Sequence, residues 1–339
     1  AAGGAARALR DDRAAAAGAL PGGLAIDPAK VTVSGVSSGA YFAVQMHVAY
    51  SKTFSGVGVL AGGPFFCAQD NVETALGACM KGNHSGGIDV DYLVSVTQNS
   101  AATGVIDNTA NLAHDRVWLF SAQDDTVVDR SVVEATRAYY SAYIKDDGLI
   151  AAVFDKPGEH SQQTDAFGEP CDFLKTSGDI YLNDCNYDAA GAMLQHLNDN
   201  TLTQAPTPTS TYNGTGSLVA FSQPMYTVGV WSSTFGLDET GWVYVPKQCA
   251  SGAQKCALHV ALHGCLMNYQ HIGLDFVTHA GYNAWADANG IVVVYPQAIA
   301  NLLNPKACWD WWGYSGMDYA SNLGVQMSFV KSVIDTLMS

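Results

Sequence analysis

Apolar residues along the chain gather in short continuous runs, and longer segments with helical character lie between them. The runs that predict buried strands cover residues 31–33, 116–120, 150–154, 242–246, 257–262 and 291–296. The segments that predict helices cover residues 40–50, 189–197, 282–288 and 323–337. This alternation predicts an α/β fold with a mostly parallel central sheet and helices on both of its faces.

Five residues between the first predicted strand and the first predicted helix match the G-x-S-x-G pattern: Gly35-Val36-Ser37-Ser38-Gly39. The two outer glycines permit a tight turn that a Cβ would obstruct, so the central serine hydroxyl is pushed out over the end of the sheet. The pattern occurs by chance in many chains. The flanking strand and helix are what identify Ser37 as a candidate nucleophile.

A serine nucleophile needs a base and a carboxylate that orients the base. With this elbow, the chain order is serine, acid, histidine, each on a loop after a strand. Asp124 and Asp125 both follow strand 116–120; we prefer Asp125, because its D-x-V-V arrangement resembles the acid loop of many α/β-hydrolases. The alternative is that both aspartates only cap a turn. His160 follows strand 150–154 in a Gly/Pro turn and is the candidate base.

Three other histidines lie in polar or helical surroundings that suit a solvated or core imidazole: His84, His114 and His196.

An oxyanion hole requires two backbone amides. One is expected from Ser38, the residue after the nucleophile, and the other from a loop that follows a neighbouring strand. Strand 257–262 ends in His263-Gly264-Cys265 and fits the second role, yet it lies more than 200 residues after Ser37. The last predicted helix would also lead into the elbow strand if the chain ends were joined. These features predict a circular permutation of the α/β-hydrolase order.

Residues 201–216 have the composition of a linker and mark the expected permutation joint. We therefore expect an Ala-rich extension at residues 1–23 and a single catalytic domain at residues 24–339. Two domains split at the linker are the alternative. That alternative is disfavoured because the serine, acid and base lie before the linker and the oxyanion strand after it.

Several motifs together carry a family resemblance: Gly35–Gly39, Ala61-Gly62-Gly63-Pro64, Cys185-Asn186-Tyr187-Asp188, Leu262-His263-Gly264-Cys265-Leu266, Tyr295-Pro296-Gln297-Ala298 and Cys308-Trp309-Asp310-Trp311. From about Leu24 onward the chain resembles the secreted fungal-type polyhydroxybutyrate (PHB) depolymerases, circularly permuted members of the α/β-hydrolase superfamily.

The resemblance implies hydrolysis of poly(3-hydroxybutyrate) to short oligomers or monomer, without a cofactor. It implies Ser37, Asp125 and His160 as the catalytic triad, and the backbone amides of Ser38 and Cys265 as the oxyanion hole. It also implies that Trp311 contacts substrate beside a crevice. We expect Trp311 at the surface of that crevice, and the neighbouring Trp309 and Trp312 in the core.

Eight cysteines, an even number, suit an oxidising compartment. Proximity along the chain and the resemblance together suggest four disulfides: Cys67–Cys79, Cys171–Cys185, Cys249–Cys256 and Cys265–Cys308. There is no C-x-x-C or H-E-x-x-H motif, and His259 and His263 lie four apart on a predicted strand, where they are poor joint ligands. We therefore expect no metal.

The composition narrows the range of partners. A net charge of −15 argues against nucleic acid or an anionic membrane, whereas an uncharged polyester carries no charge to be repelled. The expected partners are therefore the insoluble polyester and its soluble oligomers. No apolar run reaches transmembrane length, and residues 1–23 lack the apolar stretch of an intact signal peptide. We expect a secreted, extracellular monomer. The alternatives are a carbohydrate-linked acetyl or feruloyl esterase and a non-catalytic polymer-binding protein with the hydrolase fold.

Overall fold

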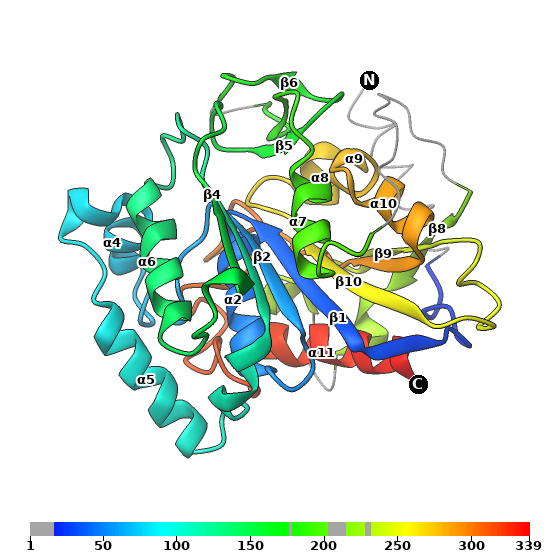
Figure 1. The fold of residues 1–339 in the computed structure, drawn as a ribbon, viewed down its shortest axis with the longest axis horizontal. Helices are drawn as coiled ribbons and strands as arrows, with labels where there is room; N and C mark the ends of the chain where they lie inside the picture. The colour runs from blue at the N-terminus through cyan, green and yellow to red at the C-terminus, as the bar shows by residue number, and fades with distance from the viewer. Residues whose placement is uncertain (1–16, 176–177, 203–214, 228–231) are drawn as a thin grey trace.

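The computed structural model describes residues 17–175, 178–202, 215–227 and 232–339 (Figure 1). Within these ranges, eight strands form a central sheet in the order β4-β3-β2-β1-β10-β11-β9-β8. The first six of these strands run parallel, and β9 and β8 complete the sheet through antiparallel pairs. A second sheet of three short parallel strands has the order β5-β7-β6. The expected α/β-hydrolase fold with a mostly parallel sheet is confirmed.

The strands are β1 (Ile26–Val36), β2 (Gly56–Leu60), β3 (Arg116–Phe120), β4 (Ile150–Val153), β5 (Gln162–Thr164), β6 (Glu169–Pro170), β7 (Leu182–Asp184), β8 (Ser217–Ser222), β9 (Thr240–Val245), β10 (Cys256–Leu262) and β11 (Ile291–Tyr295). The α-helices are α2 (Ser38–Ala49), α3 (Val72–Leu76), α4 (Ala78–Lys81), α5 (Val90–Ala102), α6 (Arg130–Ser141), α7 (Ala189–Leu197), α8 (Tyr269–Ile272), α9 (Asp275–His279), α10 (Tyr282–Asn289) and α11 (Val325–Met338).

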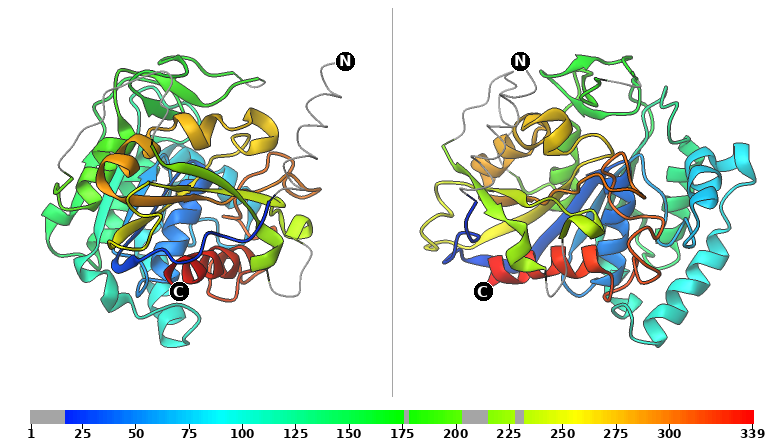
Figure 2. Two further views of the ribbon diagram at one scale, coloured as in Figure 1. Left: turned by 90° about the vertical axis from the view of Figure 1, so that its right-hand side faces the viewer. Right: turned by 180° about the vertical axis from the view of Figure 1, so that it is seen from behind.

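Both faces of the central sheet are buried, because helices cover each of them. Successive side chains of a strand point to opposite faces and so enter different layers. On β11, for example, Val292 and Val294 belong to one apolar cluster and Val293 and Tyr295 to the other. The first cluster includes side chains of α2, α5, α6 and α11, and the second includes side chains of α7, α9 and α10. Figure 2 shows these layers from two further sides.

Helix α2 lies at the centre of the molecule. All twelve of its residues are buried, which is the pattern of a core helix that has no solvent face. It begins at Ser38, directly after the elbow at the carboxyl end of β1. The most buried helix therefore starts at the candidate nucleophile.

The boundaries of most expected elements agree closely with the structure, with two differences at the sheet edge and the amino-terminal side. The expected strand 242–246 corresponds to β9, and β8, which was not expected, precedes it as the edge strand. The expected extension at residues 1–23 includes Gly18, which pairs with Phe221 of β8, and Leu20, which is buried. Domain packing therefore begins before residue 24. Residues 1–16, and residues 203–214 of the expected linker, lie outside the described ranges.

We infer that the chain carries the expected circular permutation. Strand β10 pairs directly and in parallel with β1, although it follows β1 by more than 200 residues. Helix α11 packs against β1, and the views of Figures 1 and 2 place its carboxyl end beside the start of that strand. Joining the chain ends would therefore continue α11 into β1, as an unpermuted order requires.

A rearranged chain tests this inference. We expect an active, folded enzyme when Ser339 is joined to Leu24 by a short Gly/Ser linker and new ends are opened between residues 207 and 211. The reason is that α11 packs against β1 and every pairing of the named strands is kept, while only the bridge between Gly18 and Phe221 is lost. Circular dichroism and ester hydrolysis, beside the native order as control, are the measurements. An insoluble product from several linker lengths would contradict the inference.

Candidate active site

The turn at Ser37 brings backbone segments so close together that only glycine fits at positions 35 and 39. Ser37 has φ 55° and ψ −124°, a left-handed conformation that a side-chain-bearing residue rarely adopts. A Cβ on Gly35 would lie 2.2 Å from the Gly39 carbonyl carbon, and a Cβ on Gly39 would lie 2.4 Å from the Leu262 carbonyl oxygen. The G-x-S-x-G pattern is therefore required here by close backbone contacts.

Ser37 is set apart from its neighbours by exposure. Every other residue from Val31 to Ser51 is buried, whereas Ser37 is half-buried. Its backbone N–H donates to the Leu60 carbonyl of β2 at 2.9 Å, which fixes the turn against the next strand. The elbow thus places one hydroxyl outside an otherwise closed core.

The candidate base and acid are bonded to each other. His160 Nδ1 lies 2.8 Å from Asp125 Oδ2, and both side chains are buried. The other oxygen, Asp125 Oδ1, accepts hydrogen bonds from the backbone N–H groups of Val127 and Val128 at 2.9 and 2.8 Å. The Asp125 carboxylate is thereby fixed by its own loop, and it fixes the orientation of the His160 imidazole. The other ring nitrogen, Nε2, has no hydrogen-bond partner among the described residues and can accept a proton.

Asp124 does not contact His160 but bonds to Gly158. Its side chain accepts a hydrogen bond from Gly158 N at 3.2 Å, and its own N–H donates to the Gly158 carbonyl at 3.1 Å. Asp124 is exposed and joins the acid loop to the loop that carries His160. Of the two aspartates left open by the sequence, Asp125 is the one that contacts the histidine.

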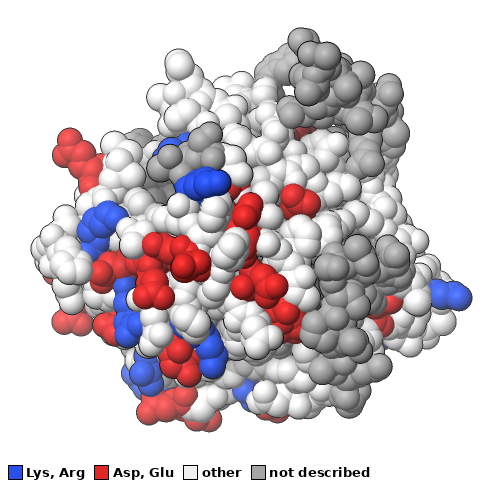
Figure 3. Space-filling model, turned by 90° about the horizontal axis from the view of Figure 1, so that it is seen from above, with Lys and Arg blue, Asp and Glu red and all other residues white. Residues whose placement is uncertain are grey.

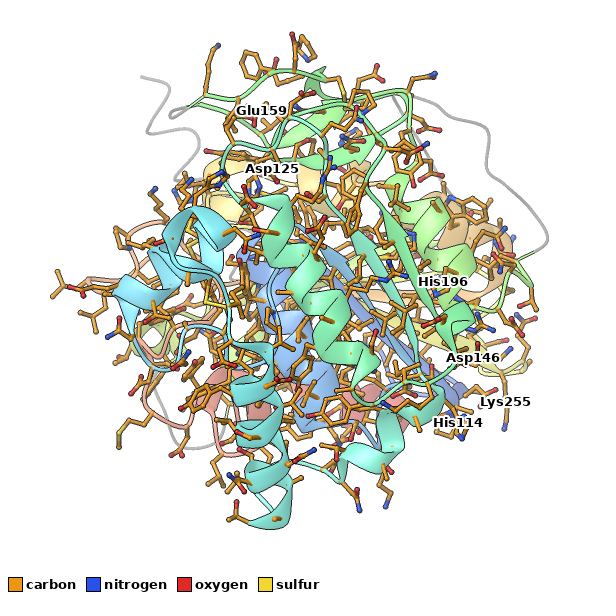
Figure 4. All side chains as sticks on the ribbon, turned by 60° about the vertical axis from the view of Figure 1, so that its left-hand side comes forward. His114, Asp125, Asp146, Glu159, His196 and Lys255 are labelled. Atoms are coloured by element: carbon orange, nitrogen blue, oxygen red, sulfur yellow. A yellow bond between two sulfur atoms is a disulfide. The ribbon has the colours of Figure 1, made fainter. Side chains whose placement is uncertain are left out.

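Glu159 is a further residue of this site that the sequence analysis missed. Its carboxylate accepts hydrogen bonds from Thr126 N at 3.1 Å and from Thr126 Oγ1 at 2.9 Å. It also accepts a bond from the backbone N–H of His160 at 3.1 Å. Figure 4 shows Asp125 and Glu159 together at one end of the molecule. Glu159 therefore holds the acid loop and the base loop together.

The small sheet β5-β7-β6 lies beside the base loop. The backbone N–H of Glu159 donates to the Cys171 carbonyl at 3.0 Å, and Gln163 Nε2 donates to the Pro157 carbonyl at 2.5 Å. The disulfide Cys171–Cys185 closes this small sheet. His160 is thus supported from the side of the acid loop and from the side of the small sheet.

Sheet topology brings the site segments to one edge. The strands β1, β3, β4 and β10 run parallel, so their carboxyl ends lie at the same edge of the sheet. Ser37 follows β1, Asp125 follows β3, His160 follows β4 and Cys265 follows β10. Ligands of open α/β sheets bind at this edge.

The loop after β10 approaches the elbow closely. A Cβ on Gly264 would lie 3.3 Å from Ser37 Cβ and 3.3 Å from the Val36 carbonyl oxygen. His263 is fully buried and holds this loop: its Nε2 accepts from Ala298 N at 3.0 Å, so its Nδ1 carries the proton and donates to the Gly264 carbonyl at 2.7 Å. Burial lowers the pKa of His263 to about 4, which keeps this tautomer neutral.

Two backbone amides, on the residues that follow Ser37 and Gly264, have no acceptor among the described residues. Neither the Ser38 N–H nor the Cys265 N–H donates a hydrogen bond to another of the described residues. The Ser38 amide is also at the first position of α2, where the helix dipole favours negative charge. These are the two amides expected to form the oxyanion hole.

The four disulfides of the structure are the four pairs suggested by the sequence analysis: Cys67–Cys79, Cys171–Cys185, Cys249–Cys256 and Cys265–Cys308. The last of these joins the loop after β10 to the segment that contains Trp309 and Trp311. It ties together two segments that flank the elbow.

The expected surface position of Trp311 is wrong. Trp311 is 6% exposed, and its ring stacks on Tyr41 with 4.1 Å between ring centroids. Trp309 is fully buried, as expected, whereas Trp312 is half-buried and not a core residue. The stack on Tyr41 covers Trp311 because Tyr41 lies one helical turn after Ser37. The expected contact of Trp311 with substrate stays a prediction.

No group of three or more His, Cys, Asp or Glu residues suited to a metal ion is found among the described residues. His259 lies between two hydroxyls, Thr32 Oγ1 at 2.8 Å and Ser34 Oγ at 2.8 Å, and burial lowers its pKa to about 3. His259 and His263 each have separate protein partners, so they do not form a shared ligand pair.

Comparison with known proteins gives several extensive matches, although no family model matches the chain. A polyhydroxybutyrate depolymerase of Talaromyces funiculosus is 36% identical over 338 residues, which cover 96% of this chain and 94% of that protein. A poly(3-hydroxybutyrate) depolymerase of Delftia acidovorans is 42% identical over 320 residues, or 93% of this chain. The chain spans only 61% of the length of the Delftia protein.

Solved structures agree with these matches. A crystal structure of a PHB depolymerase from Penicillium funiculosum superposes with a TM-score of 0.81 at 33% sequence identity, covering 94% of this chain and 98% of that one. A second structure, with the same TM-score and coverage, is a serine-to-alanine variant of a PHB depolymerase in complex with a trimer of (R)-3-hydroxybutyrate.

Substitutions at the bonded residues test the site. We expect Ser37→Ala and His160→Ala each to remove nearly all hydrolysis of a soluble nitrophenyl ester, and the double variant to lose little more, because these residues act as one unit. Asp125→Asn should lower kcat by up to about 10⁴-fold, since the imidazole loses its orienting carboxylate.

The matched control is Asp124→Asn, which we expect to be mild because Asp124 contacts Gly158 and not His160. A crippled Asp124→Asn variant beside a nearly normal Asp125→Asn variant would reverse the assignment.

Trp311→Ala separates packing from substrate contact. Loss of the buried ring should lower the free energy of unfolding by about 3–5 kcal/mol. If Trp311 also contacts the polymer, degradation of the polymer should fall further than hydrolysis of a soluble ester, because only the polymer uses binding energy from remote contacts. Melting temperature and both rates are the measurements, with the half-buried Trp312→Ala as control. Equal losses on both substrates would leave Trp311 with a packing role alone.

Proposed function

The chain belongs to the polyhydroxybutyrate depolymerase family, and from this premise we propose that it is a serine esterase that hydrolyses the ester bonds of poly(3-hydroxybutyrate). The observation that carries the proposal is the half-buried Ser37 on a strained turn, at the same sheet edge as the bonded pair His160–Asp125. The proposed products are short hydroxybutyrate oligomers or monomer.

The proposed reaction has two steps. His160 Nε2 takes the proton of Ser37 as the hydroxyl attacks an ester carbonyl, and the Ser38 and Cys265 amides stabilise the oxyanion. The tetrahedral intermediate collapses to an acyl-enzyme, and the alcohol end of the polymer leaves with the proton from His160. Water, activated by His160, then releases the acid and restores Ser37. Asp125 stabilises the imidazolium in both steps.

An exposed apolar turn beside the site suits an insoluble polyester. Leu302 is 96% exposed and Leu303 is 68% exposed, at the tip of a turn that follows β11. The Asn301 side chain accepts the backbone N–H of Leu303, and the turn leads to Lys306, whose carbonyl accepts the Leu266 N–H at 2.8 Å. The two leucines are therefore presented on a hydrogen-bonded turn, beside the loop of the Cys265 amide.

The surface charge also suits an uncharged polymer. Figure 3, seen from above with respect to Figure 1, shows broad areas without charged side chains and more acidic than basic groups. A net charge of −15 disfavours nucleic acid and anionic membranes as partners. Within the described ranges, no helix is both long and apolar enough to cross a bilayer. Four disulfides support a secreted, extracellular enzyme, and we propose that it acts as a monomer.

A turbidity assay tests the function. We expect the protein to clear a suspension of poly(3-hydroxybutyrate) and release hydroxybutyrate, and Ser37→Ala to leave the suspension turbid. The Ser37→Ala variant is the matched control for polymer binding without hydrolysis. Clearing by Ser37→Ala, or cleavage of acetylated or feruloylated carbohydrate without any action on the polyester, would refute the proposal.

Substitutions in the apolar turn test the contact with polymer. The double change Leu302→Ser with Leu303→Ser should slow polymer clearance roughly tenfold or more, because each leucine loses about 1.5–3 kcal/mol of potential burial. Hydrolysis of a soluble nitrophenyl ester should stay unchanged. Leu323→Ser is the control: Leu323 is 62% exposed, next to Asn322, whose carbonyl accepts the Tyr50 hydroxyl at the far end of α2. Equal losses in the turn and control variants would contradict the assignment.

A further inference from the structure

One segment, residues 308–315, contacts both the loop of Cys265 and the start of α2, which carry the two proposed oxyanion donors. Cys308 is bonded to Cys265, whose amide is one of the two proposed donors. The Trp309 N–H donates to Ser38 Oγ at 3.4 Å, beside the other donor. The Trp311 ring stacks on Tyr41, one turn into the helix that begins at Ser38. The conformation of this segment therefore bears on both donors.

A single buried carboxylate determines that conformation. Asp310 is fully buried, and its Oδ1 accepts the N–H groups of Trp312, Gly313 and Tyr314 at 3.3, 2.8 and 3.1 Å. Its Oδ2 accepts the N–H of Ser315 at 2.8 Å and the Ser315 hydroxyl at 2.5 Å. Five donors therefore converge on one side chain, and four of them are consecutive backbone amides.

The backbone of Asp310 is also held on both sides. Its N–H donates to Gln326 Oε1 of α11 at 2.9 Å, and its carbonyl accepts Gln45 Nε2 of α2 at 3.0 Å. None of the ion pairs among the described residues includes Asp310. A buried carboxylate is costly unless it is fully hydrogen-bonded, so the segment must close around Asp310 in this one arrangement.

We propose that Asp310 is a positioning residue for ester hydrolysis, which sets the segment 308–315 so that the Ser38 and Cys265 amides point to the same oxyanion. The inference rests on the proposed function. It deepens that proposal, because it assigns the alignment of the oxyanion hole to a residue that contacts neither the substrate nor the triad. Oxyanion donors act only when they are fixed in place before the reaction.

Graded substitution tests the inference on a soluble nitrophenyl ester. Asp310→Ala removes all five acceptor contacts and should lower kcat by about 10- to 100-fold, short of the 10²–10³-fold typical of losing a whole oxyanion donor. Asp310→Asn keeps an oxygen for three of the amides and should fall between Asp310→Ala and the native enzyme. KM should change little, because the ground-state ester uses these amides weakly.

Two further readouts separate positioning from folding. Titration with a fluorophosphonate counts folded sites, so kcat is expressed per titrated serine. The affinity for a boronic acid that mimics the tetrahedral intermediate should weaken by the same factor as kcat/KM. Asp115→Asn is the matched control. Asp115 is a buried carboxylate that lies 3.1 Å from His47, and His47 is in the last turn of α2, away from the elbow. This control variant should lower the melting temperature without changing kcat per site.

If Asp310→Ala does not fold, Ser315→Ala removes one of the five donors and keeps the carboxylate; we expect a several-fold loss of kcat. Unchanged kcat per site and boronate affinity in the Asp310 and Ser315 variants, with activity still dependent on Ser37, would overturn this inference alone. Activity that persists in Ser37→Ala would overturn the proposed function and this inference with it.

Discussion

The close contact between the elbow and the end of β10 is the constraint on which the site depends. The register pairs Gly35 with Leu262, so β1 and β10 end side by side, and Gly39 meets the carbonyl groups of Leu262 and His263. Any side chain at Gly39 would push the start of α2 away from the end of β10. Because the contact is made by backbone, it fixes Ser37, the first amide of α2 and the loop of Cys265 in one rigid unit.

Around this unit, each remaining group is held by contacts that do not belong to the reaction. Asp124 and Glu159 join the acid loop to the base loop, and Asp310 shapes the segment behind the elbow. Disulfides close the small sheet beside His160 and bind Cys265 to Cys308. Much of this support is polar and buried or covalent, which keeps the geometry of the site fixed and suits the proposed action on a solid polymer.

Local sequence patterns were sufficient to predict the elbow, most strands, the pairing of Asp125 with His160 and the four disulfides, because each depends on a short motif, a chain order or a family resemblance. The expected bounds of β3 and α7 agree with the structure. Glu159 was missed because its partner Thr126 lies 33 residues away, on a loop that only the fold brings close. Asp310 was missed because its partners, although only two to five residues further along the chain, are backbone amides that no residue type marks. The burial of Trp311 depends on Tyr41, which is 270 residues away in the chain.

The central claim is that Ser37 is the nucleophile, activated by His160 and exposed by the elbow. Mass spectrometry after reaction with a serine-directed fluorophosphonate tests it most directly. We expect one adduct per molecule, mapped by proteolysis to the peptide that contains Ser37, and a much slower reaction in His160→Ala, because the hydroxyl then lacks its base. An adduct on another serine, or an equally fast reaction without His160, would contradict the account.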